Sequence, residues 1–351
     1  DYFSSPDAAF SFYGTGQGYG NDNSITLTQI GNNTLKWEEV TQANIGLDFQ
    51  VFKNRLRGSL DVYHKTTDDL FQDRPISLIN GTNEIRANIG SLVNKGGDWE
   101  LHYDLLKKDD LTFTLNFVGN YNHNELTELP SETGEIIGIG RVGGKIFETR
   151  LIRYAGVNPG NGNLLFLDAD GNLTENPDPD ADAVWTGKNA TPDATGSFGF
   201  NLNYKGFYLD TQWSYVIGVD RHDLVHYELL NNGFAPGAFN LSRELLNAWT
   251  PDNRFTDIPS FDAFNATAFR LQNDRFYYDS DYLRLRFLNI GYNFPSKFLK
   301  NTGLTSLKIF GSAENLVTFT RWRGFDAESR ATAFRQYPTP RILSFGIELG
   351  L

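Results

Sequence analysis

Three patterns in the sequence predict an all-β protein that forms a transmembrane antiparallel β-barrel. Apolar and polar residues alternate in about nine segments, the period of a strand with two different faces. The connections between these segments alternate between short turns and long loops, as they do in outer-membrane barrels. The last nine residues alternate without a break up to the end of the chain, and a barrel needs its last strand intact because unpaired backbone groups are costly in lipid.

The composition agrees with many strands and excludes several other classes of protein. Aromatic residues make up 14% of the 351 residues, Gly occurs 34 times and charged residues make up 21%, which suits strands joined by turns. No apolar run is long enough for a transmembrane helix. The absence of cysteine excludes disulfides and thiolate metal sites. The net charge of −12 argues against a nucleic-acid partner, which would require a basic face.

The first four strands are expected as two hairpins. Each strand has apolar residues at every second position, and a short polar turn joins the two strands of each pair. Their lengths suit a tilted strand that crosses a bilayer. The hairpins cover residues 44–51 and 56–63, followed by 98–105 and 111–117.

The last five strands begin with a third hairpin around a tight turn at Lys205-Gly206. In the next strand, Arg284 and Arg286 share parity with Leu288 and Ile290, so we expect a bulge or the membrane boundary there. These five strands cover residues 198–204, 207–217, 282–294, 304–319 and 343–351.

Loop lengths favour a barrel over a soluble sandwich, which would seldom hold loops of about 60–70 residues without structure of their own. Bacterial single-chain barrels have an even number of strands, so nine strands predict further strands before Asp1. The short connections are 53–55, 107–110, 205–206 and 295–303, and the long ones are about 67–96, 122–194, 218–281 and 320–342.

Four segments of the chain resemble the C-terminal region of SusC-like TonB-dependent outer-membrane transporters, the SusC/RagA family. One of them reads DYLRLRFLNIGYNFPSKFL, and the matches occur in the right order over nearly the whole chain. The four segments are residues 31–70, 248–260, 281–299 and 314–330 continued at 337–351, with shorter echoes at 94–103 and 191–210.

The resemblance implies that residues 1–351 are the C-terminal portion of a 22-stranded barrel, with the plug domain and N-terminal strands outside this chain. It also implies active import of a large nutrient, an oligosaccharide or a peptide, across the outer membrane of a Gram-negative bacterium. A SusD-like lipoprotein lid would capture the nutrient, and TonB, contacted through the missing N-terminal region, would supply energy. The family is not enzymatic, and no catalytic motif stands out in the sequence.

Aromatic and charged residues in the predicted extracellular loops are the candidates to face a ligand or partner. Aromatic faces stack on sugar rings, while guanidinium and carboxylate groups hold hydroxyls or peptide termini. The alternative is that these residues pack the loops together or dock a partner. The candidates are Trp185, Tyr227, Trp249, Trp322, Arg323, Asp326, Arg330 and Arg335.

One acidic loop is a candidate for Ca²⁺ binding. Asp168, Asp170 and Asn172 supply the oxygen ligands that hard cations prefer. The spacing of an EF-hand is not met, so the alternative is a solvated acidic loop. No metal site is assigned.

Two short helices are predicted in the loop 218–281, at 222–231 and 242–249, with Ser242 as a candidate N-cap. His222 and His226 are spaced i, i+4 and could share a helix face as metal ligands do. No third ligand follows at a suggestive spacing, so this pair is not assigned as a metal site.

The final strand is expected to close the barrel. Its polar parity, from Ser344 to Gly350, should face the lumen, and its apolar parity should face lipid. An alternative is a soluble all-β module for carbohydrate binding or surface adhesion. A third possibility, an outer-membrane enzyme, needs convergent acid and base residues that we do not find. The apolar residues of the closing strand are Leu343, Phe345, Ile347, Leu349 and Leu351.

Overall fold

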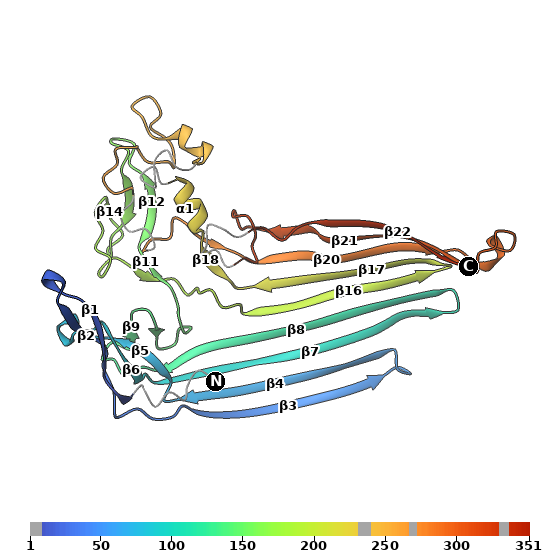
Figure 1. The fold of residues 1–351 in the computed structure, drawn as a ribbon, viewed down its shortest axis with the longest axis horizontal. Helices are drawn as coiled ribbons and strands as arrows, with labels where there is room; N and C mark the ends of the chain where they lie inside the picture. Colours follow the sequence, from blue (N-terminus) through green and yellow to red (C-terminus); the bar gives the residue numbers. More distant parts are fainter. Residues whose placement is uncertain (1–8, 231–239, 267–271, 330–336) are drawn as a thin grey trace. The chain divides into compact units, whose positions relative to one another are not determined.

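The computed structural model describes residues 9–230, 240–266, 272–329 and 337–351. Its largest element is a nine-stranded sheet with the strand order β22-β21-β20-β17-β16-β8-β7-β4-β3 (Figure 1). All nine predicted strands are confirmed. Their bounds are β3 Glu39–Val51, β4 Leu56–Asp68, β7 Ser91–Lys108, β8 Leu111–Glu128, β16 Ala194–Tyr204, β17 Phe207–Ile217, β20 Tyr282–Asn293, β21 Ser306–Thr320 and β22 Ile342–Gly350.

Some strands differ in extent from the prediction. β7 and β8 each have 18 residues, because their backbones remain extended beyond the part where apolar and polar residues alternate. β22 ends at Gly350, so Leu351 follows the strand rather than belonging to it. Among the described residues, none of the helices has the length and apolar character that crossing a membrane requires.

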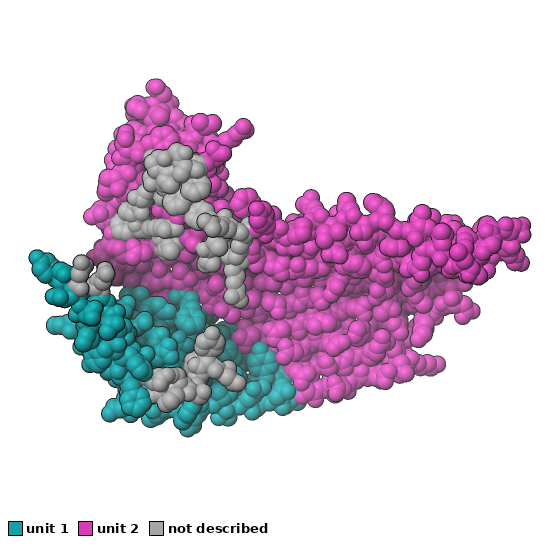
Figure 2. Space-filling model, viewed as in Figure 1, with its two compact units in different colours: residues 1–45, 62–96, 123–148 teal, residues 46–61, 97–122, 149–351 magenta. Residues whose placement is uncertain are grey.

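The chain folds as two compact units, shown in different colours in Figure 2. The smaller unit comprises residues 1–45, 62–96 and 123–148, and the larger one comprises 46–61, 97–122 and 149–351. The smaller unit contains elements that the alternation pattern did not predict. These are β1 Phe12–Gln17, η2 Tyr19–Asn21, β2 Asn23–Gln29, β5 Phe71–Pro75, η3 Leu78–Asn80, β6 Glu84–Asn88, β9 Glu135–Ile136 and β10 Gly140–Arg141.

The smaller unit has a hydrophobic core of its own. Ile89 and Leu126 are fully buried within it. Beside this core the guanidinium of Arg141 donates two hydrogen bonds of 3.2 Å to the buried carboxylate of Glu148. The core residues are Leu70, Ala87, Ile89, Leu92, Leu126, Leu129 and Ile139.

In the larger unit, strand register gives the sheet two chemically different faces, because paired residues of antiparallel strands point to the same side. One row across six strands consists of Phe113, Leu202, Leu209, Ile290, Gly311 and Phe345. The adjacent row, on the opposite face, consists of Thr114, Asn201, Asp210, Asn289, Ser312 and Ser344.

The polar face carries hydrogen bonds between side chains of neighbouring strands. The amide of Asn116 donates to the oxygen of Asn201 at 2.7 Å, and the amide of Asn201 donates to Asp210 at 2.9 Å. On the same face, an imidazole nitrogen of His102 lies 2.6 Å from the Asn116 oxygen. Polar side chains therefore link β7, β8, β16 and β17 across the sheet.

An aromatic belt crosses the apolar face in the larger unit. Phe198 and Trp213 stack at 6.1 Å between ring centroids, and Trp213 and Phe319 stack at 6.3 Å. Gly196 makes room for the belt, because a Cβ atom there would lie 2.5 Å from the Tyr215 hydroxyl. The belt consists of Trp99, Phe117, Phe198, Trp213, Tyr215 and Phe319.

The expected irregularity in β20 is a bulge. The pairing of β20 with both neighbours shifts register between Leu285 and Phe287. Against β17 the extra residue is Arg286, whereas against β21 the extra residue lies on β21, between Glu314 and Val317. The bulge resolves the parity conflict, since it returns Leu288 and Ile290 to the apolar face while Arg284 stays on the polar face.

The long loops of the larger unit form small sheets and short helices at one end of the long strands (Figure 1). The predicted helix 222–231 begins only at Leu224, because His222 ends a strand that pairs with β19. The elements are β11 Arg150–Leu151, β12 Arg153–Val157, β13 Leu164–Leu167, β14 Leu173–Thr174, β15 Val184–Trp185, β18 Asp220–His222, α1 Leu224–Leu230, η4 Arg243–Asn247 and β19 Tyr277–Asp279. At the other end, η5 Ser296–Phe298 lies in the turn between β20 and β21.

Candidate functional site in the long loops

The long loops of the larger unit have a closed core. Ile152 and Phe166 are fully buried, and Leu164 is 2% exposed. Asn265 ties a distant segment to this core, because its side chain accepts from the Leu164 amide and donates to the Leu164 carbonyl, both at 2.9 Å. The loops are therefore an ordered scaffold on which ligand-facing groups can be held.

Glu175 organises the turn between β12 and β13. Its carboxylate accepts hydrogen bonds from the side-chain amides of Asn158, Asn161 and Asn163 at 2.6, 2.7 and 2.7 Å. Burial tends to raise the pKa of Glu175, but the three amides together lower it. A single carboxylate thus fixes a six-residue turn.

The acidic loop that suggested calcium is the turn between β13 and β14. The carboxylate of Asp168 accepts from the backbone and side-chain nitrogens of Asn172, at 2.7 and 3.1 Å. Among the residues the structure describes, no group of three or more His, Asp or Glu side chains is placed to hold a metal ion. Calcium binding at Asp168, Asp170 and Asn172 stays a prediction.

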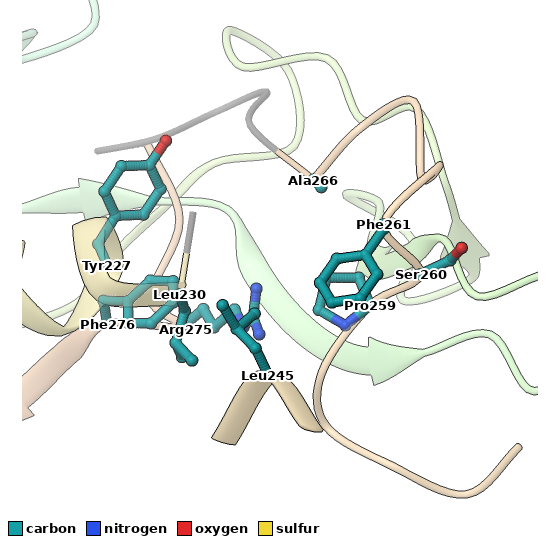
Figure 3. A pocket seen from close by; sticks show the side chains of 9 residues that line it. All are labelled: Tyr227, Leu230, Leu245, Pro259, Ser260, Phe261, Ala266, Arg275 and Phe276. Atoms are coloured by element: carbon teal, nitrogen blue, oxygen red, sulfur yellow. The ribbon is translucent and has the colours of Figure 1, made fainter. Parts of the chain in front are cut away.

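A narrow cleft lies between α1, η4 and the segment 259–266 (Figure 3). The guanidinium of Arg275 lies over the rings of Tyr154 and Phe276, at 5.3 and 4.8 Å from their centroids, and burial lowers its pKa. The cavity volume is ≈ 10 Å³, about the space of one buried water. The cleft as it stands is therefore too small for a large ligand. Its lining is Tyr227, Leu230, Leu245, Pro259, Ser260, Phe261, Ala266, Arg275 and Phe276.

The last long loop is fastened to the polar face of β20 by two arginines. Arg284, 4% exposed, forms ion pairs with Asp326 and, at 3.0 Å, with Glu328. Arg286 also pairs with Glu328 and donates to the Ser214 hydroxyl at 2.8 Å. β20 and this loop lie in the segments 281–299 and 314–330, two of those that carry the family resemblance. The ion pairs of Arg284 and Arg286 join these two segments.

Asp326 is held by backbone groups as well as by Arg284. Its carboxylate accepts from the amides of Glu328 and Thr339 at 3.0 and 2.9 Å. Burial acts to raise the pKa of Asp326, but the hydrogen bonds from Arg284 and these amides hold it well below its usual range. Asp326 is therefore an ionised structural anchor of the loop.

Three of the predicted ligand-facing residues are buried. Tyr227 packs edge-on against Phe276, and Trp322 packs with Tyr282 in a hydrophobic cluster. Asp326 is 6% exposed. For Tyr227, Trp322 and Asp326 the structure shows loop packing, because their side chains are enclosed by the loops and by β20.

The other candidates occupy different environments. Trp249 is partly buried and donates from its indole nitrogen to the Pro159 carbonyl at 3.2 Å. Trp185 is also partly buried, in β15, and its indole nitrogen has no hydrogen-bond partner among the described residues. Arg323 is exposed and lies over Tyr278. Arg330 and Arg335 lie outside the described residues, and a ligand-facing role for all of these residues stays a prediction.

His222 and His226 do not share a helix face. His222 ends β18, and its buried Nδ1 atom has no hydrogen-bond partner in the part of the chain that the structure describes. His226 lies in α1, with its Nε2 atom 3.2 Å from the Glu244 carboxylate. Ser242 does cap a helix, since its hydroxyl accepts from the Glu244 amide at 3.2 Å, although this helix is of the 3-10 type.

Sequence reasoning did not identify Arg275 or the Arg284–Asp326 pair as parts of the loop region. The one available signal was that Arg284 and Arg286 share strand parity with the apolar residues Leu288 and Ile290. Such a pattern indicates an irregularity in the strand. Arg275 carries no comparable signal, since its aromatic partner Tyr154 lies 121 positions earlier in the chain.

A sheet of long strands with one apolar face, one polar face and an aromatic belt is typical of β-barrel outer-membrane proteins. A family model described as "TonB dependent receptor-like, beta-barrel" matches residues 2–144. The TonB-dependent receptor P3 of Formosa agariphila is 31% identical, over 93% of this chain and 35% of the receptor. The TonB-dependent receptor SusC of Bacteroides thetaiotaomicron is 26% identical, over 91% of this chain and 32% of SusC.

Solved structures agree with these sequence relatives. The RagAB peptide transporter matches with a TM-score of 0.75 and 28% identity, over 97% of this chain and 38% of that one. Over more than nine-tenths of its length the chain is similar to SusC-like TonB-dependent receptors, which confirms the resemblance and the fold class. These receptors are outer-membrane transporters rather than enzymes. The chain spans about a third of the length of the curated relatives it matches.

Proposed function

We propose that the whole protein imports a large nutrient, an oligosaccharide or a peptide, across the outer membrane. In this proposal a SusD-like lipoprotein captures the nutrient, and TonB supplies the energy. The residues described above form part of the barrel wall and the loops at its extracellular mouth. The observation that carries the proposal is the match to SusC and to the RagAB peptide transporter over more than nine-tenths of this chain.

The two faces of the sheet support the same arrangement. The row through Leu209, Ile290 and Phe345 is suited to lipid, and the row through Asn201 and Asp210 is suited to a wet lumen. The loops at one end have their own buried core and many hydrogen-bonded polar groups, which suits a position in water. In this proposal we expect Trp185, Trp249 and Arg323 to be among the groups that meet a nutrient or the lid.

Uptake by living cells tests the proposal. A strain that lacks the gene is compared with the same strain carrying the intact gene, using labelled oligosaccharide and peptide mixtures. We expect uptake of one mixture only with the intact gene, and its loss when a protonophore collapses the proton gradient. Equal uptake with and without the gene for every mixture would contradict the import function.

The partnership is tested separately on the full-length protein purified from outer membranes in detergent. We expect a SusD-like lipoprotein, identified by mass spectrometry, to remain bound in a stable ratio. Recovery of the transporter without any such lipoprotein, from cells grown on the imported nutrient, would argue against the lid. Partition of the protein into the aqueous phase without detergent would contradict the barrel itself.

A further inference from the structure

The segment 321–329 of the last long loop has a fixed base. Trp322 and Ala327 are 7% and 2% exposed, and the ion pair of Asp326 with Arg284 holds the segment from below. Arg221 fastens it from another side, because its guanidinium donates to the Ser329 carbonyl at 3.0 Å and lies 5.5 Å from the Trp322 ring centroid. Side chains on the opposite side of this segment are therefore presented from a rigid support.

Three side chains of this segment are exposed. The side chain of Arg321 is 88% exposed, Phe325 is 70% exposed, and Arg323 is exposed between them. Arg321 has a carboxylate partner, since its guanidinium lies 3.6 Å from Asp279. Within the described part of the chain, Arg323 donates no hydrogen bond and forms no ion pair.

The guanidinium of Arg323 is nevertheless held in place. It lies 5.5 Å from the centroid of the Tyr278 ring, a cation–π contact. Tyr278 is itself oriented by an edge contact with Trp322 and by its hydroxyl, which lies 3.4 Å from Nδ1 of His226. The protein has 43 acidic and 31 basic residues. In a chain with this excess of acids, an exposed, oriented arginine that has no acidic partner among the described residues is a group available for a ligand.

A guanidinium presents parallel N–H donors that match the two oxygens of a carboxylate. Holding that group in place before binding reduces the entropy lost on binding. We propose that Arg323, with the apolar ring of Phe325 nearby on the same segment, is a subsite for a carboxylate group of the transported ligand. This inference rests on the proposed import function and deepens it, because it assigns the nutrient an acidic group.

The carboxylate can come from the C-terminus or side chain of a peptide, or from a uronic acid in an oligosaccharide. Both sources offer Arg323 the same two oxygens. The apolar surface of an amino acid or of a sugar ring can then lie against Phe325. A neutral ligand has no group that Arg323 alone would select.

Binding to the full-length protein in detergent tests the inference by calorimetry. The peptide probes are a hexapeptide with a free C-terminal carboxylate and the same peptide as its carboxamide. The saccharide probes are an oligouronate and its methyl ester. We expect one acid to bind about tenfold tighter than its neutral counterpart, as one charge-assisted pair can provide. We expect Arg323→Met to remove that preference. Arg323→Lys should retain only part of it, because lysine lacks the parallel N–H donors of a guanidinium.

Arg321→Met is the matched control, since it removes the same charge two residues away from an arginine that already has a partner. It should leave the acid preference unchanged. Equal binding of acid and neutral probes by the unaltered protein, or an acid preference that survives Arg323→Met, would overturn the inference. Equal losses from Arg321→Met and Arg323→Met would do the same, because they would indicate a general charge effect. If nutrient uptake by cells still depends on the gene in any of these cases, the import function stands without the subsite.

Discussion

The long strands and the long loops of the larger unit bury their apolar groups in opposite ways. On the last strand, Phe345 is 88% exposed and Ile347 is 67% exposed. In the loops, Phe166 and Ile152 are completely buried. The sheet therefore leaves its apolar surface for a surrounding medium to cover, whereas the loops enclose theirs.

The sheet and the loops obtain their stability from different sources. The apolar face of the sheet gains free energy only when lipid or detergent covers it. The loops gain theirs from internal contacts and from buried polar groups whose partners lie in the same unit. The effect of a substitution on stability should therefore depend on the membrane mimic when the residue lies in the sheet. It should not depend on the mimic when the residue lies in the loops.

The largest expected effect concerns the ion pair that joins the two regions. Arg284→Met leaves the carboxylate of Asp326 buried without its cation, which typically costs about 3–5 kcal/mol. We expect the segment 321–329 to open locally, with faster hydrogen exchange at the Glu328 and Thr339 amides that bond to Asp326. Hydrogen exchange followed by mass spectrometry measures this directly.

The paired substitution Arg284→Met with Asp326→Leu is the matched control. It removes both buried charges, so it should open the segment less than Arg284→Met alone. Unchanged exchange in the single variant would mean that the loop is held without the arginine.

A second prediction separates the two faces of one strand. Ile290→Arg places a charge on the apolar face, at a cost that reaches about 2–4 kcal/mol at the middle of a bilayer and falls towards its surfaces. Asn289→Arg places the same charge on the adjacent polar position, whose partner across β17 is Asp210, and should cost little. Thermal unfolding in lipid vesicles compares the two variants. A larger loss for Asn289→Arg would reverse the assignment of the faces.

The sequence was sufficient for the strands and insufficient for the loops, for a physical reason. Alternation is a local signal, so Phe198 to Tyr204 and Leu343 to Gly350 could be assigned from neighbouring residues alone. Parity also indicated the bulge at Arg286. The loop contacts join residues far apart in the chain, such as Asn265 with Leu164, and no local period encodes them.

Ligand-facing residues are difficult to assign from the sequence for the same reason. Aromatic and charged residues in loops are suitable both for ligand contact and for packing, and the choice depends on what lies opposite each side chain. Trp322 was selected for its ring, but Tyr282 and Ala327 enclose it. Arg323, one residue later, is exposed, although its guanidinium lies over the ring of Tyr278, which also contacts Trp322.

A third prediction concerns the aromatic belt. Gly196→Ala places a Cβ atom 2.3 Å from the Val118 carbonyl oxygen and 2.5 Å from the Tyr215 hydroxyl. Such overpacking typically costs about 1–3 kcal/mol. The unfolding temperature of the sheet should fall, while hydrogen exchange in the loops stays unchanged. Ser197→Ala, at the next position, should have almost no effect, and equal losses in the two variants would show that the belt needs no glycine.

The smallest expected effect is a pH dependence confined to the loops. Burial disfavours the imidazolium form of His222 and lowers its pKa to about 4, whereas an unfolded histidine titrates near about 6.5. Between these values the unfolded loop binds a proton that the folded loop does not, so stability falls as the pH falls from about 6.5 towards 4. Below the folded pKa the decline ends.

From pH 7 to 5.5 the loops lose about 1 kcal/mol of stability. Hydrogen exchange at the paired strands β18 and β19, measured across this range, should accelerate at low pH while exchange in β16 and β17 does not. His222→Asn should flatten the dependence, because it removes the titrating group, and His226→Asn should retain the part that His222 contributes. A decline that persists in His222→Asn would assign the effect to another group. An equal acceleration of hydrogen exchange in β16 would contradict the contrast between loops and sheet. His222 lies in the loops, so its protonation should not change exchange in that strand.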